Sequence, residues 1–197
     1  MPEIGTVLLA AGRGSRFGPA PKLLAPLDGK PLVRHAAESA LGAGPRPVVI
    51  VLGAHADAVR AALAGLDLIY VENPDFAAGL ATSLRAGLAA LPASCTAAVV
   101  VLGDMPRVTA AHIDRLVSAF ADAEPAAVVP VQDGRYGNPV LLNLRRLGAD
   151  ISHLRGDHGA GPLLRGRADV LEIPGDAATG LDIDTPAALA ALRDIQA

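Results

Sequence analysis

Short apolar runs alternate with amphipathic stretches along the first two thirds of the chain. The apolar runs are rich in β-branched residues, which is typical of strands buried on both faces of a sheet. They span residues 5–10, 47–52, 66–71, 97–102 and 126–131. Between them, apolar residues recur at helical spacing over residues 31–43, 55–64, 80–91 and 109–123. This alternation predicts an α/β fold, with a Rossmann-like, mostly parallel sheet and helices on both faces.

The last third of the chain departs from this rhythm. Turn signals at Asp133-Gly134 and Gly137-Asn138-Pro139, and a glycine-rich segment at 156–161, predict an excursion that builds one side of a cleft. Thr185-Pro186 then offers an N-cap hydroxyl and a proline at the first helical position, so a final helix is expected to run to about Ile195. No repeat or long linker divides the sequence, which predicts a single domain over residues 1–197.

Composition and charge narrow the class of partner. With 197 residues, 51% of them hydrophobic, the chain can bury one sizeable core. The net charge is −3, and there are only two Tyr, three Phe and no Trp. Neither a basic surface nor stacking platforms for nucleic acid are therefore expected, and a small-molecule partner is favoured.

Cysteine usage and hydropathy bear on the compartment. The lone Cys95 cannot form an internal disulfide and is expected to be a buried small hydrophobe. No apolar run approaches the roughly 20 residues that span a bilayer, and no basic leader precedes the first apolar stretch. These features predict a cytoplasmic protein without membrane contact.

A glycine-rich loop, Gly12-Arg13-Gly14-Ser15-Arg16-Phe17-Gly18, follows the first predicted strand, and Lys22 stands four residues later. Its small residues let backbone N–H groups approach phosphate oxygens, and Arg16 and Lys22 add positive charge, which predicts a polyphosphate site. An ordinary strand-to-helix turn that uses glycine for positive φ is the structural alternative.

Two well-known phosphate-binding loops fit this segment less well. A P-loop needs Gly-Lys followed by Ser or Thr, whereas Lys22 lies between Pro21 and Leu23. In the dinucleotide fingerprint the third glycine leads directly into a helix, whereas here it falls one place late and prolines follow.

An aspartate, Asp104, ends the fourth predicted strand in the sequence Gly103-Asp104-Met105-Pro106. Ligands of parallel α/β sheets collect at this carboxyl edge. Mg²⁺ favours one or two carboxylates together with phosphates and waters, so Asp104 is the first metal candidate. A role in capping the turn is the alternative.

The segment Leu9-Ala10-Ala11-Gly12-x-x-x-Arg16-Phe17-Gly18 with Lys22, and the later Gly-Asp-x-Pro turn, resemble the signature of the MobA-like NTP transferases, whose members usually carry Met in place of Phe17. The resemblance implies a fold of the nucleotide-diphospho-sugar transferase type and a Mg²⁺-dependent nucleotidyltransferase. Catalytic roles are implied for Arg16, Lys22 and Asp104, the first two neutralising charge on the leaving pyrophosphate. The implied nucleotide-binding residues are Leu9, Ala10, Ala11, Gly12, Arg13, Gly14, Ser15, Lys22, Gly79, Ser83 and Asp104.

A second acidic segment, Asp182-Ile183-Asp184-Thr185-Pro186, resembles the second metal-binding element of that family. Alternation along an extended segment would direct Asp182 and Asp184 to one side and Ile183 toward the core. Asp182 is favoured as the second ligand beside Asp104, because Asp184 precedes the helix and is available to cap it.

The resemblance also bears on the nucleotide. Ala11 in Leu-Ala-Ala-Gly is similar to the cytidylyltransferase branch, so CTP is expected rather than GTP. Gly79-x-x-x-Ser83-Leu84 resembles the segment of the same branch that opens a helix near the base and ribose. A turn and a core helix capped by Thr82 or Ser83 explain that pattern as well.

The acceptor side is implied by two later segments. Those around Asn138 and Asp157 resemble the family's acceptor-side segments, although the branch commonly has His at Asn138 and Arg at Gly161. Residues 1–110 would then bind mainly NTP and residues 130–185 mainly the acceptor, a molybdopterin-type phosphate. The product would be handed to a molybdoenzyme or its chaperone.

Two other functions remain open. The resembled family includes members with other chemistry, one of them a reductase that acts on a pigment of nicotine breakdown, so an NAD-dependent reductase is one possibility. Against it, the second predicted strand ends in Leu52-Gly53 without the acidic residue that holds an NAD ribose. A non-catalytic nucleotide sensor is the other possibility, because fold alone does not fix function. Lys22 and Asp104 argue against the sensor, since both suit catalysis of phosphoryl transfer.

Overall fold

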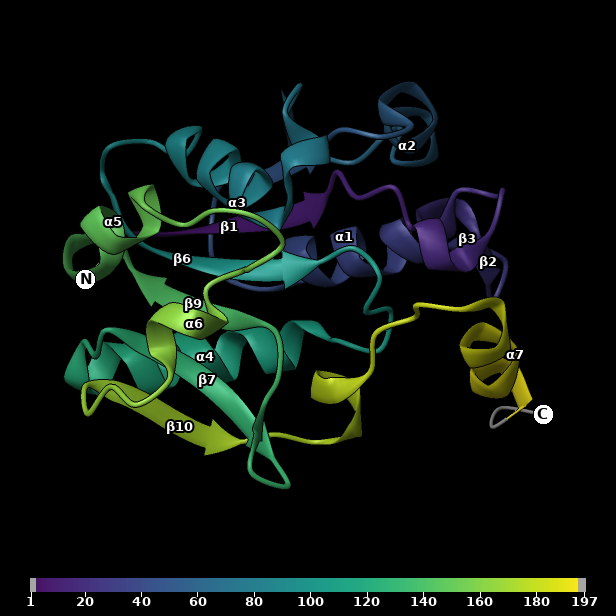
Figure 1. The fold of residues 1–197 in the computed structure, drawn as a ribbon. Coiled ribbons are helices and arrows are strands. Elements are labelled where there is room, and N and C mark those ends of the chain that lie inside the picture. Colours follow the sequence, from purple (N-terminus) through teal and green to yellow (C-terminus); the bar gives the residue numbers. More distant parts are fainter. Residues whose placement is uncertain (1–2, 195–197) are drawn as a thin grey trace.

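One eight-stranded sheet runs through the computed structural model, which describes residues 3–194 (Figure 1). The strand order is β10-β7-β9-β6-β1-β4-β5, with β8 paired to β7. The bounds of these strands are β1 (Glu3–Ala10), β4 (Val48–Leu52), β5 (Ile69–Glu72), β6 (Cys95–Leu102), β7 (Ala127–Gln132), β8 (Arg135–Tyr136), β9 (Val140–Asn143) and β10 (Val170–Pro174). A separate hairpin is formed by β2 (Pro26–Leu27) and β3 (Lys30–Pro31).

The sheet is mostly parallel, as predicted. β1 runs parallel to β4 and β6, and β10 runs parallel to β7, whereas β9 is antiparallel to both β6 and β7. The last third of the chain was expected to be an excursion beside a cleft. It also contributes β9 and β10 to the sheet itself, because Val140–Asn143 is fully buried between two strands.

Helices cover both faces of the sheet, which confirms the predicted layering (Figure 1). One face packs against α1 (Leu32–Gly42) and α4 (Ala110–Ala123), the other against α3 (Leu80–Ala89) and α5 (Leu144–Ser152). Alternate strand residues enter the two cores, Leu8 on one face and Val7 on the other. The shorter helices are α2 (Ala56–Ala62) and α6 (Gly161–Leu164), and the 3₁₀ turns are η1 (Ser15–Phe17), η2 (Lys22–Leu24), η3 (Phe76–Ala78) and η4 (Ala177–Gly180).

The third predicted strand, residues 66–71, was wrong in its start and in its burial. β5 begins at Ile69 and forms the edge of the sheet beyond β4. Its residues are exposed or half-buried, and Ile69 is 45% exposed. An edge strand can be as apolar in sequence as a central one, because its burial depends on neighbours far away in the chain.

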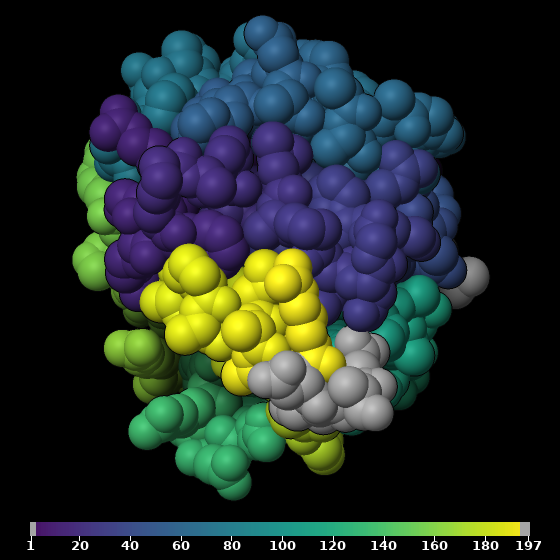
Figure 2. Space-filling model, turned by 90° about the vertical axis from the view of Figure 1, so that its right-hand side faces the viewer, coloured from purple at the N-terminus to yellow at the C-terminus, as the bar shows by residue number. Residues whose placement is uncertain are grey.

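The C-terminal helix α7 (Pro186–Asp194) packs against the N-terminal part of the chain. Leu189 and Leu192 share a small core with Phe17 and Leu32. Figure 2 shows this C-terminal segment lying against the N-terminal residues. The expected end of the helix at Ile195 lies outside the described residues. No helix within residues 3–194 is long and apolar enough to cross a membrane.

Candidate active site

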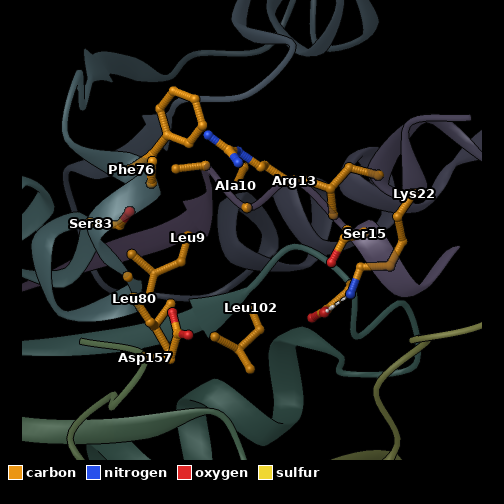
Figure 3. A pocket seen from close by; sticks show the side chains of 17 residues that line it. Leu9, Ala10, Arg13, Ser15, Lys22, Phe76, Leu80, Ser83, Leu102 and Asp157 are labelled. Atoms are coloured by element: carbon orange, nitrogen blue, oxygen red, sulfur yellow. Dashed lines mark hydrogen bonds and ion pairs between the residues drawn. The ribbon is translucent and has the colours of Figure 1, made fainter. Parts of the chain in front are cut away.

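A cavity of about 400 Å³ opens where β1 and β6 end (Figure 3). Its lining includes every residue for which the sequence predicted nucleotide binding, so the structure brings that set together; its role in binding stays a prediction. The lining residues are Leu9, Ala10, Ala11, Gly12, Arg13, Gly14, Ser15, Lys22, Leu23, Phe76, Ala77, Gly79, Leu80, Ser83, Leu102, Asp104 and Asp157.

The glycine-rich loop folds tightly around Lys22. Gly14 has φ +62°, a left-handed conformation that glycine adopts without strain. A Cβ atom at Gly14 would also stand 2.8 Å from the Cβ of Lys22. Glycine at this position therefore lets the lysine lie against the loop, so that its ammonium group extends into the cavity beside Ser15 (Figure 3).

Lys22 forms two ion pairs at this end of the cavity. Its Nζ atom lies 2.6 Å from an oxygen of Asp104 and 3.0 Å from an oxygen of Asp184. Burial would lower the pKa of Lys22, but the negative charge of Asp104, reinforced by Asp184, holds it above its ordinary value. Lys22 is therefore a fixed positive charge at neutral pH.

Asp104, Asp182 and Asp184 form an acidic cluster, with one oxygen of each lying within 4.8 Å of the others. Ile183 between them is fully buried, and its N–H donates to the Asp104 carbonyl at 3.0 Å. The predicted alternation is confirmed. An oxygen-only set of this kind suits a hard divalent cation. Lys22 contacts two of the three carboxylates, so it competes with a cation for them.

The reason given for favouring Asp182 over Asp184 was wrong. Thr185 caps α7 by accepting a hydrogen bond from the Ala188 N–H at 3.1 Å, and Asp184 is engaged with Lys22. Asp182 stays exposed, but partial loss of its hydration raises its pKa, and the negative charge of Asp184 raises it further. Burial opposes ionisation of Asp184 too, but its pairing with Lys22 leaves its pKa below the ordinary value. The preference for Asp182 as ligand stays a prediction.

Arg16 lies at the edge of this cluster. Its guanidinium is 2.7 Å from Asp184, and its side chain is 77% exposed. Among the described residues it lies outside the cavity lining. The predicted role of Arg16 at the leaving pyrophosphate therefore stays a prediction, and its position is peripheral to that of Lys22.

The opposite end of the cavity is shaped by the start of α3. Ser83 is 4% exposed and accepts a hydrogen bond from the side-chain amide of Asn73 at 3.0 Å. Gly79 is the N-cap of α3 and Thr82 lies inside the helix, so the alternative of a cap at Thr82 or Ser83 was wrong. Asn73 thus holds the Ser83 hydroxyl in place at the cavity wall.

Gly79 also allows a distant loop to cross the start of α3. Its φ is +110°, and a Cβ atom there would overlap the backbone of Gly156 and lie 2.7 Å from the nitrogen of Asp157. The Ala81 N–H donates to the Gly156 carbonyl at 3.1 Å. This close contact brings Asp157 to the cavity, whereas Asn138 lines a smaller neighbouring cavity.

Several lining residues went unrecognised in the sequence. One of them is Phe76, whose ring centroid lies 5.4 Å from the guanidinium carbon of Arg13, a residue that was predicted (Figure 3). Phe76, one of only three phenylalanines, immediately precedes the Gly79 segment, which is a signal that could have indicated it. Leu80 and Leu102 gave no signal, because their patterns are those of ordinary core residues.

Comparisons with known proteins agree with this geometry. The family model described as MobA-like NTP transferase domain matches residues 6–171. Nicotine blue oxidoreductase of Paenarthrobacter nicotinovorans is 34% identical over 94% of this chain and 94% of that protein. The bifunctional protein GlmU of Kineococcus radiotolerans is 41% identical over 62% of this chain, which spans about a quarter of that relative (26%).

Solved structures are similar over nearly the whole chain. Rv0371C of Mycobacterium tuberculosis, in complex with manganese, has a TM-score of 0.80 and 31% identity, covering 98% of both chains. A nucleotidyl transferase from Methanothermobacter thermautotroptrophicus has a TM-score of 0.83 and 25% identity, covering 98% of this chain and 97% of that one. These similarities confirm the predicted fold of the nucleotide-diphospho-sugar transferase type. The chain therefore belongs to the MobA-like NTP transferase family.

Proposed function

We propose that this protein transfers a nucleoside monophosphate, cytidylate from CTP rather than guanylate from GTP, to the phosphate of a molybdopterin-type acceptor. The observation that carries the proposal is the convergence of the glycine-rich loop, Lys22 and Asp104 on one cavity, with Asp182 and Asp184 clustered beside Asp104. Backbone amides and a part-buried lysine suit a triphosphate, and the carboxylates suit the cation that accompanies it.

The reaction is an in-line displacement at the α-phosphorus. An oxygen of the acceptor phosphate forms the new P–O bond, and the bond from the α-phosphorus to the bridging oxygen of the β-phosphate breaks. The electron pair of that bond leaves with pyrophosphate. Because the attacking phosphate is already ionised, no side chain has to remove a proton, and positioning with charge neutralisation supplies the catalysis.

Each group of the site has a role in this scheme. The amides of residues 11–15 hold the phosphates, and the Lys22 ammonium neutralises charge on the leaving pyrophosphate. Asn73 positions the Ser83 hydroxyl, which lies 4% exposed at the end assigned to the base. Arg16 assists from the rim through Asp184.

Mg²⁺ is the proposed cation. Asp104 and Asp182 would hold it, with Asp184 as the third carboxylate of the cluster. The chemistry that a bound Mg²⁺ supplies is neutralisation of negative charge on the triphosphate. The manganese complex of Rv0371C, a protein 31% identical to this chain, supports a divalent cation.

Pyrophosphate release tests the proposal. Purified protein with Mg²⁺ and molybdopterin cofactor is supplied with CTP, GTP, ATP and UTP in separate reactions, and release is expected with CTP. Release with GTP alone would keep the transferase and overturn the inference from Ala11. Nucleotide binding without release from any of the four would favour a sensor.

A reductase is the second candidate, favoured by the similarity to nicotine blue oxidoreductase over 94% of both chains. Against it, β4 ends in Leu52 and is followed by Gly53, without the acidic residue that holds an NAD ribose. Oxidation of NADH or NADPH in the presence of a quinonoid dye would support the reductase, measured as a loss of absorbance at the nicotinamide band.

A further inference from the structure

Two chain segments meet at the acidic cluster, and a histidine outside the cavity links them. Asp104 lies in the turn between β6 and α4, while Asp182 and Asp184 lie between η4 and α7 (Figure 1). His112, in the first turn of α4, is 64 positions away from Asp176, the N-cap of η4, yet its Nε2 atom lies 2.9 Å from an Asp176 carboxylate oxygen. This contact joins the helix after Asp104 to the turn before Asp182.

The two ring nitrogens of His112 have different partners. The backbone N–H of Thr109, the N-cap of α4, donates to Nδ1 at 2.9 Å, so Nδ1 carries no hydrogen in this arrangement. The proton of the neutral imidazole is then on Nε2, which donates it to Asp176. This hydrogen bond holds the pKa of Asp176 below its ordinary value, so the carboxylate is ionised at neutral pH. The imidazole thus bridges α4 and η4.

Capping of α4 explains only half of this arrangement. In the common capping box the third helical residue is Glu or Gln, whose end group is used on the backbone of the N-cap. His112 occupies that position and has a second nitrogen on the far side of its ring. Its side chain is 13% exposed, and the second nitrogen contacts Asp176. The contact with Asp176 is therefore additional to the cap.

The turn η4 is itself held by several hydrogen bonds. The Asp176 carboxylate accepts from the N–H groups of Ala178 and Thr179 at 3.0 and 3.3 Å. Thr179 is 2% exposed, and its hydroxyl donates to the Asp176 carbonyl at 2.7 Å. On the other side of the turn, the Thr179 carbonyl accepts from the Asn138 N–H at 2.8 Å. A displacement of Asp176 would therefore be transmitted along η4.

The chain that follows η4 meets the Asp104 turn directly. Ile183 is fully buried, and its N–H donates to the Asp104 carbonyl at 3.0 Å. Arg115 of α4 donates to the Pro174 carbonyl at 2.7 Å, which holds the end of β10 but not η4. The two acidic segments are thus joined at Ile183 and again, through α4 and η4, at His112. Two separate joints fix an orientation that one hydrogen bond would leave free to pivot.

We propose that His112 is a positioning residue of the cation site. By holding Asp176 it fixes the turn η4. The position of η4 in turn sets where the carboxylates of Asp182 and Asp184 lie relative to Asp104. The inference rests on the proposed function, since it assigns the acidic cluster to a divalent cation. Groups hydrogen-bonded to metal ligands commonly change metal affinity by about ten- to a hundredfold, and His112 acts one step further away, so about fivefold is expected.

Two substitutions separate the contact with Asp176 from the cap of α4. In His112→Asn the shorter side chain places an amide oxygen near the position of Nδ1, so the cap is kept and the contact with Asp176 is lost. In His112→Gln the longer side chain places an amide N–H near the position of Nε2, so the contact with Asp176 is kept. His153→Asn is the matched control, because His153 is exposed at the end of α5.

Mn²⁺ alone is the probe, so the test needs neither nucleotide nor turnover. The full-length protein is titrated with Mn²⁺, and the free ion is followed by electron paramagnetic resonance. Asp104→Asn shows which part of the binding belongs to the acidic cluster. We expect His112→Asn to weaken that part by about fivefold, and His112→Gln and His153→Asn to change it by less than about twofold.

Hydrogen exchange measures the joint itself. In His112→Asn the amides of Thr179 and Ile183 should exchange about fivefold faster, because the turn before the acidic segment loses one hydrogen bond. The amide of Leu8, buried in the central strand β1, should exchange as in wild type. Faster exchange at Leu8 as well would assign the effect to global stability and overturn the positioning role.

The positioning role and the proposed function fail in different ways. Mn²⁺ binding that weakens in His112→Asn and is retained in His112→Gln, without pyrophosphate release from any NTP, would support the positioning role and remove the transferase. Unchanged Mn²⁺ affinity in His112→Asn, or equal weakening in His112→Gln, would overturn the positioning role even if the protein transfers cytidylate.

Discussion

The two ends of the cleft are built in opposite ways. At the phosphate end, one contiguous loop supplies backbone amides, and Lys22 is locked between Asp104 and Asp184 at 2.6 and 3.0 Å. In the neighbouring cavity, which contains Asn138, the mostly apolar walls come from strands and helices far apart in the chain. The first end is therefore fixed by neighbouring residues and ion pairs, and the second by the packing of distant segments.

Removal of the Asp104 carboxylate at the phosphate end should cause the largest loss of turnover. Asp104→Ala is expected to lower turnover by about a thousandfold, the upper range for loss of one electrostatic group. The fold should survive, because the hydrogen bond from the Ile183 N–H uses the Asp104 backbone carbonyl. Pyrophosphate release and the melting temperature are measured together.

The exposed Asp122 on α4 provides the control, since Asp122→Ala should change neither quantity. A parallel fall of activity and melting temperature in Asp104→Ala would assign the residue to structure rather than to chemistry.

Loss of the part-buried Lys22 ammonium group should have the second largest effect. Lys22→Ala is expected to lower kcat/KM for the NTP by about a hundredfold and to affect the acceptor KM less. Lys30→Ala, which removes a lysine paired with Glu38 at 2.7 Å on the surface, is the matched control. NTP kinetics that remain unchanged in Lys22→Ala would remove this lysine from the site.

A smaller effect is expected for the Ser83 hydroxyl, which lies in the cavity wall at the start of α3. Ser83→Ala should reduce the preference for CTP over the other nucleotides by about tenfold, because one hydrogen bond to the base is lost. Ser118→Ala is the control, since Ser118 donates to the Asp114 carbonyl on the exposed side of α4. Equal preference in wild type and Ser83→Ala would place the base elsewhere.

The smallest effects are expected for substitutions in the helices that pack against the sheet, and they are measured as changes in the free energy of unfolding. At Gly87 in α3 a Cβ atom would overlap Val7 and lie 2.8 Å from a methyl group of Val51, so Gly87→Ala should destabilise by about 1–3 kcal/mol. Gly148→Ala, in open space on α5, should stabilise by about 0.5–1 kcal/mol. Urea unfolding measures both, and equal shifts would contradict the close contact of α3 with the sheet.

The contrast between neighbouring residues and segments far apart in the chain also explains which strands and helices could be predicted from the sequence. The strands at Gly5–Ala10 and Ala97–Leu102 and the helix at Thr109–Ala123 were predicted closely, because their hydrophobic periods are long and regular. β9 and β10 were not predicted as strands. β9 directly follows the turn signal at Gly137-Asn138-Pro139, and β10 lies at the edge of the sheet with no fully buried residue, so neither stands out as a buried apolar run.

Residues of the candidate site were likewise easiest to predict where they are neighbours in the sequence. The loop of residues 12–18 and Lys22 could be identified because the residues that favour phosphate binding lie close together in the sequence. The preference for Asp182 rested on a capping role of Asp184, whereas the structure gives Asp184 an ion pair 162 positions away, with Lys22. In the neighbouring cavity only Leu9 and Asn138 were predicted as site residues, because its walls extend from Leu9 to Arg165 and no local pattern joins them.

The most direct test of the central claim is to follow the phosphorus atoms of CTP. CTP labelled at the α-phosphate is incubated with protein, Mg²⁺ and molybdopterin cofactor, and a parallel reaction carries the label at the γ-phosphate. The proposed function predicts α-label in the acceptor product and γ-label in pyrophosphate. Label that stays in CTP, and in the other three nucleotides tested the same way, while a dye is reduced by NADPH, would contradict nucleotidyl transfer.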